Sequence, residues 1–139
     1  LIMGDLWPES ILVDTNSDNA RLVLIDWEMC HYGNPVQDVA HLDAHLWMMQ
    51  HRCKTEKARR KMRQFQEEFT GQYRKKTEQD AAFARHVKER DYAIHYGAEI
   101  LARTTGSFQA GYLYDGLNFN DEPIQEAVNH AVQQITDIS

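Results

Sequence analysis

The sequence has no long apolar run and only two cysteines. Its longest uninterrupted apolar stretches, 22–25 and 46–49, are far shorter than the roughly 20 residues that a membrane-spanning helix needs. We therefore expect no membrane partner. Cys30 and Cys53 have no C-x-x-C spacing, which predicts buried, reduced thiols rather than a disulfide framework. No segment has the pattern of a secretory signal, so we expect a cytoplasmic protein.

Glycine-rich phosphate-binding patterns and early positive charge are also missing. The seven glycines form neither G-x-G-x-x-G nor G-x-x-x-x-G-K-[ST], the loops that cradle phosphates in self-contained nucleotide sites. Arg21 is the single basic residue before position 52. We therefore do not expect a complete nucleotide site with its own phosphate-binding lysine within this chain.

Most of the positive charge lies in one segment of a chain whose net charge is −6. Residues 52–76 hold ten of the fifteen basic residues and three acidic ones, a local charge of +7. Apolar residues at helical spacing run through it: Met62, Phe65, Phe69 and Tyr73. This pattern favours the solvated face of an amphipathic helix, with an anion-binding or partner surface as the alternative. We do not expect a nucleic-acid partner.

The length and the periodicity of the sequence predict one mainly helical domain. A chain of 139 residues with 42% hydrophobic residues suffices for one core, so we expect a single domain over 1–139. Two β-prone runs, 11–13 and 22–25, flank a turn-rich segment and predict a β-hairpin. Helical periodicity then predicts helices over 36–52, 55–76, 80–103 and 122–138. Between the last two helices, a segment with three glycines and several aromatic residues predicts a loop over 104–121. The predicted fold class is α+β, mainly α.

Three oxygen-bearing side chains near the predicted hairpin suggest phosphoryl-transfer chemistry. Asp5 lies in a loop before the first predicted strand, and Asp26 follows the second. Ser10 comes five residues after Asp5, so its hydroxyl oxygen can lie near the Asp5 carboxylate. Hard cations prefer such oxygen ligands. A loop carboxylate as base, with a strand-end carboxylate and a neutral oxygen as metal ligands, suits a reaction that depends on positioning and charge neutralisation.

Three segments together resemble a known family. They are Met-Gly-Asp-Leu-Trp-Pro-Glu-Ser-Ile-Leu at 3–12, Leu-Ile-Asp-Trp-Glu at 24–28, and Gly-Asn-Pro-Val-Gln-Asp-Val-Ala at 33–40. Their order and spacing resemble the C-terminal lobe of aminoglycoside phosphotransferase and choline kinase-like enzymes, which are similar in fold to protein kinases. The resemblance implies that the hairpin carries the catalytic and metal-binding segments of a kinase-like helical lobe.

The resemblance also implies roles for particular residues. Asp5 would be the catalytic carboxylate, Asp26 and Ser10 would bind Mg²⁺ and through it ATP, and Asp38 would brace the catalytic loop. The implied activity is ATP-dependent phosphoryl transfer to a small-molecule hydroxyl. Met3 stands where the family usually has His, an apolar replacement that is expected to cost little. Ser10 stands where the family usually has Asn, and its shorter side chain predicts weaker metal binding.

The phosphate-covering N-terminal lobe of such enzymes has no counterpart in this sequence. This leaves an alternative in which a degenerate kinase-like lobe serves as a binding or scaffold module, or catalyses another reaction. A lobe without its partner exposes apolar surface, so association with a missing N-terminal lobe or as a homodimer is expected.

Two further sets of side chains allow more than one interpretation. In the loop 104–121, Tyr112, Tyr114 and Asp115 are candidates for a substrate-facing wall, although ordinary packing against the last helix is the alternative. His41 and His45 lie on the same helical face as Asp38, so with Asp26 they could form a transition-metal site. The alternative places both histidines on a polar flank beside the catalytic loop.

Overall fold

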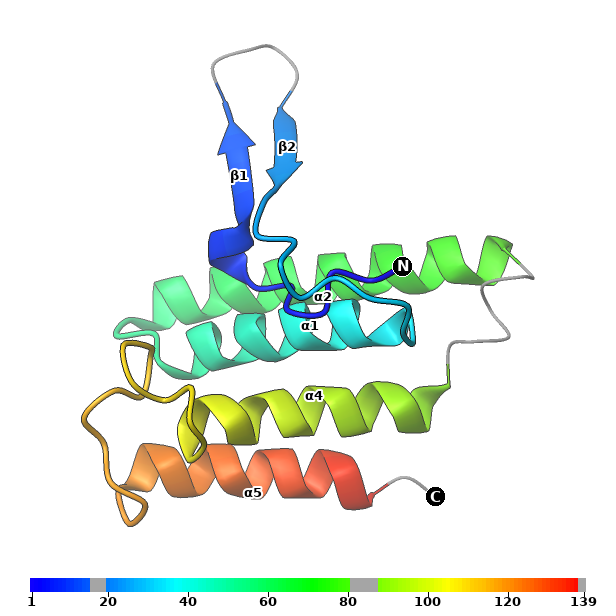
Figure 1. The fold of residues 1–139 in the computed structure, drawn as a ribbon. Helices are drawn as coiled ribbons and strands as arrows, with labels where there is room; N and C mark the ends of the chain where they lie inside the picture. The colour runs from blue at the N-terminus through cyan, green and yellow to red at the C-terminus, as the bar shows by residue number, and fades with distance from the viewer. Residues whose placement is uncertain (16–19, 81–87, 138–139) are drawn as a thin grey trace.

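The computed structural model describes residues 1–15, 20–80 and 88–137. A short helical turn, η1 (Pro8–Ser10), leads into the strands β1 (Ile11–Asp14) and β2 (Arg21–Leu24). The helices that follow are α1 (Val36–His51), α2 (Glu56–Gln79), α4 (Glu89–Thr104) and α5 (Glu122–Thr136). Figure 1 shows the hairpin projecting away from the helices, which lie side by side. The prediction of a mainly helical α+β fold with a small hairpin is confirmed.

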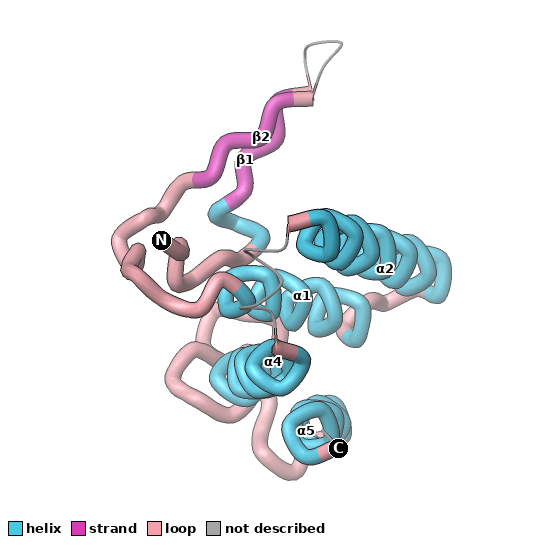
Figure 2. Tube along the Cα trace, turned by 90° about the vertical axis from the view of Figure 1, so that its right-hand side faces the viewer, coloured by secondary structure: helices cyan, strands magenta, loops and turns pink. Residues whose placement is uncertain are grey.

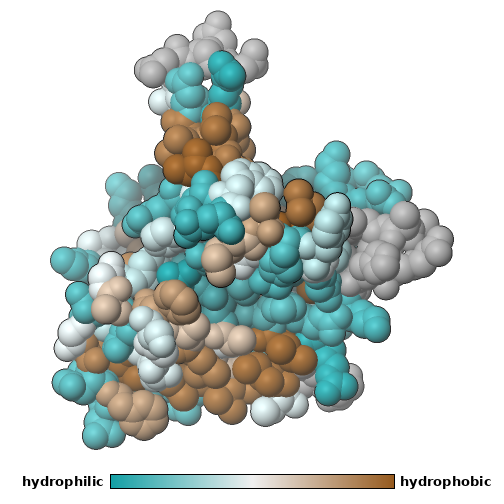
Figure 3. Space-filling model, in the orientation of Figure 1, coloured by the Kyte–Doolittle hydropathy of each residue, from teal (hydrophilic) through white to brown (hydrophobic). Residues whose placement is uncertain are grey.

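The two strands form an antiparallel pair whose register runs from Ile11 opposite Leu24 to Asp14 opposite Arg21. The predicted turn falls mostly on 16–19, outside the described residues. The strands bury little: Leu12 is 50% exposed, Leu22 is 68% exposed and Val23 is 48% exposed. Figure 3 shows this apolar surface around the lower part of the hairpin. The expectation of exposed apolar surface is therefore confirmed, and it lies on the hairpin.

The hydrophobic core lies where α1, α4 and α5 meet (Figure 2). Alanines on α1 and α5 let the helices approach closely, and larger side chains from α1, α4 and the loop 105–121 fill the remaining space. The fully buried members are Ala40, Ala44, Met48, Ile100, Tyr114, Ile124, Ala127 and Ala131. The aromatic loop therefore contributes directly to the core, through Tyr114.

Helix boundaries differ from the prediction chiefly between α2 and α4. The predicted helix over 80–103 begins later, at Glu89, and Asp80 is the extended residue that ends α2. Residues 81–87 lie outside the described part of the chain. Asp80 has φ −112° and ψ 98°, and Lys88 has φ −101° and ψ 130°, so the backbone is extended at both residues and α4 begins at Glu89. The predictions for α1 and α5 agree with the structure to within two residues.

The cysteine prediction was partly wrong. Both thiols are free, but Cys30 is exposed and Cys53 is half-buried, because both lie in connecting segments rather than in the core. On α2, Met62, Phe69 and Tyr73 are half-buried while Phe65 is 56% exposed, so the apolar stripe is narrower than predicted. No helix in the described ranges combines the length and apolar character that a membrane crossing would require.

Gly97 on α4 allows the close approach of α5, and this generates a stability prediction. A Cβ at this position would lie 2.6 Å from Ile135 Cγ1 and 2.8 Å from the carbonyl oxygen of Ala131. Gly97→Ala is therefore expected to lower the free energy of unfolding by about 1–3 kcal/mol, measured by urea denaturation.

Gly71 in α2 is the matched control, because a Cβ there would meet no atom within 4 Å. Gly71→Ala should raise stability by roughly 0.5–1 kcal/mol through helix propensity alone. Equal effects of the two substitutions would contradict the packing explanation.

Candidate functional site

The N-terminal loop that carries Asp5 is attached to the first turn of α1 by Asp38. The Met3 N–H donates to Asp38 Oδ2 at 2.6 Å, and the Gly4 N–H donates to Asp38 Oδ1 at 2.8 Å. Gln37 Nε2 adds a hydrogen bond of 3.1 Å to the Gly4 carbonyl oxygen. A carboxylate in the first turn also interacts favourably with the helix dipole. This is the contact that a bracing role for Asp38 requires.

Gly4 and Met3 adapt the loop to its surroundings. Gly4 has φ +88°, and a Cβ there would lie 2.5 Å from the Met29 carbonyl oxygen, so other residues would fit poorly. Met3 is 2% exposed, and its apolar side chain needs no hydrogen-bond partner in the interior. Ile2 and His31 exchange backbone hydrogen bonds of 2.9 and 3.2 Å. The loop is therefore tied to the segment that follows Asp26.

Ser10 closes the turn before the hairpin. Its hydroxyl donates to the Trp7 carbonyl oxygen at 2.7 Å and accepts the Trp7 N–H at 3.2 Å. The side chain is buried, at 1% exposure. The Ser10 carbonyl oxygen in turn accepts the Ile25 N–H at 2.9 Å, which places Asp26 beside this turn.

The oxygen donors of Asp26 and Ser10 are of the type that Mg²⁺ prefers. Asp26 is exposed, and its φ of +69° is the one positive value among non-glycine residues of the described ranges. Strained backbone of this kind is often kept at functional positions. The Asp26 carboxylate is a hard oxygen ligand, and the Ser10 hydroxyl keeps one lone pair after its two bonds to Trp7.

Asp5 is held from the other side by a buried ion network on α4. Arg103 Nη2 donates to Asp5 Oδ1 at 2.9 Å, and Arg103 Nε donates to Glu99 Oε1 at 2.7 Å. His45 Nε2 lies 3.0 Å from the same Glu99 oxygen, and His45 Nδ1 lies 2.6 Å from the Tyr112 hydroxyl. The Asp5 side chain is 40% exposed, whereas those of Arg103 and Glu99 are 10% and 9% exposed. The buried Glu99 and Arg103 are therefore linked by hydrogen bonds to Asp5, whose carboxylate is accessible to solvent.

The balance of charge in this network keeps Glu99 ionised. Burial by itself raises the pKa of Glu99, but the His45 hydrogen bond, the charge of His41 and the Arg103 hydrogen bond outweigh it and lower the pKa to about 2. Burial lowers the pKa of His41, against the attraction of Glu99. Burial also raises the pKa of Tyr112. An ionised Glu99 beside a neutral phenol is therefore expected at neutral pH.

The transition-metal alternative finds no support in this geometry. Asp38 accepts loop N–H groups, and His45 bonds to Glu99 and Tyr112. In the described ranges, the cluster with ligand atoms within 4.8 Å of one another is Asp5, His41 and Glu99 instead. Arg103 already bonds to both of its carboxylates, so one of the two negative charges there is balanced without a metal.

The three candidates in the loop 105–121 lie in different environments. Tyr114 is fully buried in the core, with its hydroxyl 2.7 Å from His51 Nδ1, as the packing alternative supposed. Tyr112 is half-buried beside His45, and Asp115 is exposed. Of the three, Tyr112 is the one in contact with the Asp5 network.

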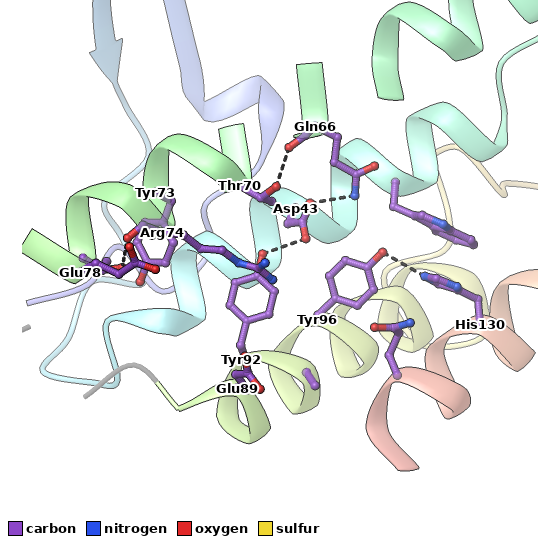
Figure 4. Close-up of a pocket in the computed structure, with 14 residues that line it drawn as sticks. Asp43, Gln66, Thr70, Tyr73, Arg74, Glu78, Glu89, Tyr92, Tyr96 and His130 are labelled. Atoms are coloured by element: carbon purple, nitrogen blue, oxygen red, sulfur yellow. Dashed lines mark hydrogen bonds between the residues drawn. The ribbon is translucent and has the colours of Figure 1, made fainter. Parts of the chain in front are cut away.

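A hollow lies on the α2 side of α1, whereas the N-terminal loop crosses the opposite side of α1 (Figure 2). It has a volume of about 790 Å³ and is lined by α1, α2, α4 and α5. Figure 4 shows Asp43 at its centre, accepting hydrogen bonds of 2.8 Å from Gln66 Nε2 and from the Tyr92 hydroxyl. Burial raises the pKa of Asp43, partly offset by these bonds. This carboxylate is already satisfied by side chains of the protein.

Comparison with known proteins identifies the family. Residues 1–75 match the phosphotransferase enzyme family, which is more than half of the chain. The chain belongs to this family. The match spans the hairpin and the segments that contain Asp5, Ser10, Asp26 and Asp38, and it confirms the resemblance to kinase-like phosphotransferases.

A similar curated protein is the 4-hydroxytryptamine kinase of Psilocybe cyanescens. It is 48% identical over 44 residues, which are 30% of this chain and 12% of that protein. The chain therefore matches only a small part of that kinase. No solved structure was found to match the chain.

Arg103 and Glu99 were missed by the sequence analysis. Their spacing, with the acid four residues before the base, is a local signal for an ion pair on a helix. Nothing local indicates that Arg103 also meets Asp5, which is 98 positions away. That contact depends on the packing of α4 against α1.

The pKa of Glu99 generates a prediction for stability. Because the pKa in the folded state, about 2, is below the usual value, Glu99 stabilises the fold above pH 4.5 and this contribution is lost as the pH falls toward 2. Glu99→Gln should cost on the order of 3 kcal/mol at pH 7, since Arg103 loses a buried partner. It should also flatten the acid part of the stability curve. Urea denaturation at pH 7 and pH 3 measures both effects.

Glu126 provides the matched control. It also pairs with a histidine, His51, at 2.9 Å, but its side chain is 59% exposed. Glu126→Gln should therefore change stability by less than about 1 kcal/mol. If the two substitutions cost the same, removing one partner from the buried network is not as costly as argued.

Proposed function

We propose that this chain is the C-terminal catalytic lobe of an ATP-dependent phosphotransferase that acts on a small-molecule hydroxyl, folded as one domain over 1–139. The observation that carries this proposal is the joining of the two carboxylate-bearing segments. The hydrogen bond from the Ile25 N–H to the Ser10 carbonyl oxygen and the Ile2–His31 bridge hold the Asp5 loop beside the segment of Asp26. Phosphoryl transfer needs a base and a metal ligand placed together in this way.

In the proposed mechanism, Asp5 accepts the proton of the acceptor hydroxyl. The hydroxyl oxygen forms a bond to the γ-phosphorus as the bond to the β,γ-bridging oxygen breaks, and ADP leaves. Asp26, assisted by Ser10, would hold Mg²⁺, which neutralises phosphate charge when bound. Asp38 keeps the backbone of Met3 and Gly4 fixed, so that Asp5 remains oriented during the reaction.

The class of acceptor is also a proposal. The similar protein from Psilocybe cyanescens is named for a hydroxylated tryptamine, so 4-hydroxytryptamine is the first acceptor to test. Tyr112, which lies against the Asp5 network, and the exposed Asp115 are the residues that we propose to face it. The free thiols of Cys30 and Cys53 are compatible with a cytoplasmic setting.

The exposed hairpin favours completion of the site by another part of the protein. Apolar side chains of the strands and of the following segment, including Leu24, Ile25 and Trp27, are each at least 40% exposed. Patches of this kind mark interaction surfaces. We propose that an N-terminal lobe covers this surface and supplies the phosphate-binding lysine; a second copy of a degenerate lobe is the alternative.

The proposed roles predict different defects for Asp5 and Asp26: loss of turnover for Asp5 and loss of metal-dependent ATP binding for Asp26. Asp5→Asn should lower turnover of 4-hydroxytryptamine by the complete protein by about 10²–10⁴-fold, because the base is lost, while Mg·ATP binding stays nearly unchanged. Asp26→Asn should abolish metal-dependent ATP binding. Steady-state kinetics and calorimetric titration measure these effects.

Asp137 is a suitable control because it is an exposed aspartate that ends α5. Figure 1 shows α5 on the other side of α4 from the N-terminal loop. Asp137→Asn should change neither turnover nor binding. Full turnover by Asp5→Asn would exclude the proposed base, and Mg·ATP binding that ignores Asp26→Asn would favour the degenerate lobe.

A further inference from the structure

We propose that Arg103, in the last turn of α4, is a positioning residue that sets the orientation of the Asp5 carboxylate for proton transfer. The inference rests on the role of Asp5 proposed above. It adds a residue that lies outside the matched region, because the family match ends at residue 75.

The first support is the way in which Arg103 binds two carboxylates at once. One nitrogen, Nη2, contacts Asp5 Oδ1 at 2.9 Å, and a different one, Nε, contacts Glu99 Oε1 at 2.7 Å. A planar guanidinium held at two points has a fixed orientation, whereas a lysine ammonium would bind as a point charge. Because Glu99 fixes the orientation of the Arg103 guanidinium, it also fixes the position of the Asp5 oxygen that the guanidinium binds.

The second support is the aromatic enclosure of the guanidinium. Its Cζ lies 5.4 Å from the ring centre of Trp7, 5.2 Å from that of Phe108 and 5.8 Å from that of Tyr112. Rings at such distances attract the cation and restrict its movement. The Arg103 side chain is 10% exposed, so its charge interacts with Asp5 with little screening by water.

The third support is the anchoring of Glu99 itself. His45 is fully buried, bonds to Glu99 through Nε2, and is held by the Tyr112 hydroxyl through Nδ1. The position of Arg103 is thus determined by three side chains from α1, α4 and the loop 105–121. Side chains supported in this manner keep a reactive group in place more accurately than a single contact does.

The consequence for Asp5 concerns its two oxygens. Within the described part of the chain, Asp5 accepts a hydrogen bond from Arg103 through Oδ1, and its side chain is 40% exposed. We assign Oδ2 to the substrate hydroxyl, since Oδ1 is engaged. Without Arg103 the carboxylate would be free to rotate, and Oδ2 would no longer be held in a fixed direction toward the substrate hydroxyl. The chemical step would suffer, but the binding of either substrate would not.

The test uses Arg103→Lys and Arg103→Ala in the complete protein, with 4-hydroxytryptamine and Mg·ATP as probes. Both variants should lower kcat by roughly 10²-fold, the scale of a misplaced catalytic group, with the KM values for both probes within about twofold of the wild type. Added guanidinium ion should restore part of the kcat of Arg103→Ala. A purely structural role would not produce this rescue.

Two further variants test whether a loss of kcat comes from misfolding or from the loss of any arginine near the loop 105–121. Arg103→Ala combined with Glu99→Gln removes both charges, so that no unpaired carboxylate stays buried, and it should show the same loss of kcat. Arg52 is the matched control because it lies 5.5 Å from the Tyr114 ring and donates to the Leu113 carbonyl oxygen at 3.2 Å. Arg52→Ala removes an arginine at the end of α1 that also contacts the loop 105–121, and it should leave kcat unchanged.

The outcomes distinguish this inference from the proposed function. Loss of kcat with unchanged KM and guanidinium rescue supports the positioning role. If Asp5→Asn is inactive while the Arg103 variants keep wild-type kcat per folded molecule, the positioning role is wrong and the proposed function stands. If Asp5→Asn keeps full turnover, the proposed function fails, and this inference fails with it.

Discussion

The arrangement of the site depends on two hydrogen bonds from the loop backbone to Asp38. They join a segment with little regular structure to the beginning of α1. Once Met3 and Gly4 are fixed, the left-handed turn at Gly4 directs the chain past Met29, and Asp5 reaches Arg103. A carboxylate that satisfies two otherwise unpaired N–H groups stabilises more than an exposed ion pair would. The segment that leads into the hairpin is thereby fixed to α1, although the strands themselves bury little apolar surface.

The helical core supplies the second half of this arrangement. Ala40 and Ala44 on α1 face the buried side of α4, so that Glu99 and Arg103 come within reach of His45 and Asp5. A buried ion network of this kind contributes little net stability compared with apolar packing, but it is costly to break and it fixes geometry. We infer that the network is present for the position of Asp5 rather than for stability. The hairpin differs from this buried network, because the apolar side chains of its strands are exposed and do not belong to the core.

The sequence predicted those parts of the structure that follow from local pattern. Two short β-prone apolar runs on either side of a turn-rich segment predicted the hairpin, and the apolar stripe after Pro35 predicted α1. The motif spacing predicted Asp5, Ser10, Asp26 and Asp38 as a group, and the structure joins the Asp5 loop to Asp38 and the Ser10 turn to the residue before Asp26. The contact of Arg103 with Asp5 could not be predicted, since it depends on how α4 packs. The start of α4 was also missed, because periodicity alone does not show that the backbone becomes extended at Asp80.

The most direct test of the account is amide hydrogen exchange, measured by NMR on the wild type and on Asp38→Asn. The Met3 and Gly4 amides should be protected in the wild type, and Asp38→Asn should accelerate their exchange by at least about tenfold, which corresponds to roughly 1.4 kcal/mol. The amide of Ile100, in the core of α4, should exchange at an unchanged rate. Exchange at Met3 and Gly4 that is equally slow in both proteins would show that the loop is held by something other than Asp38, and would contradict the account.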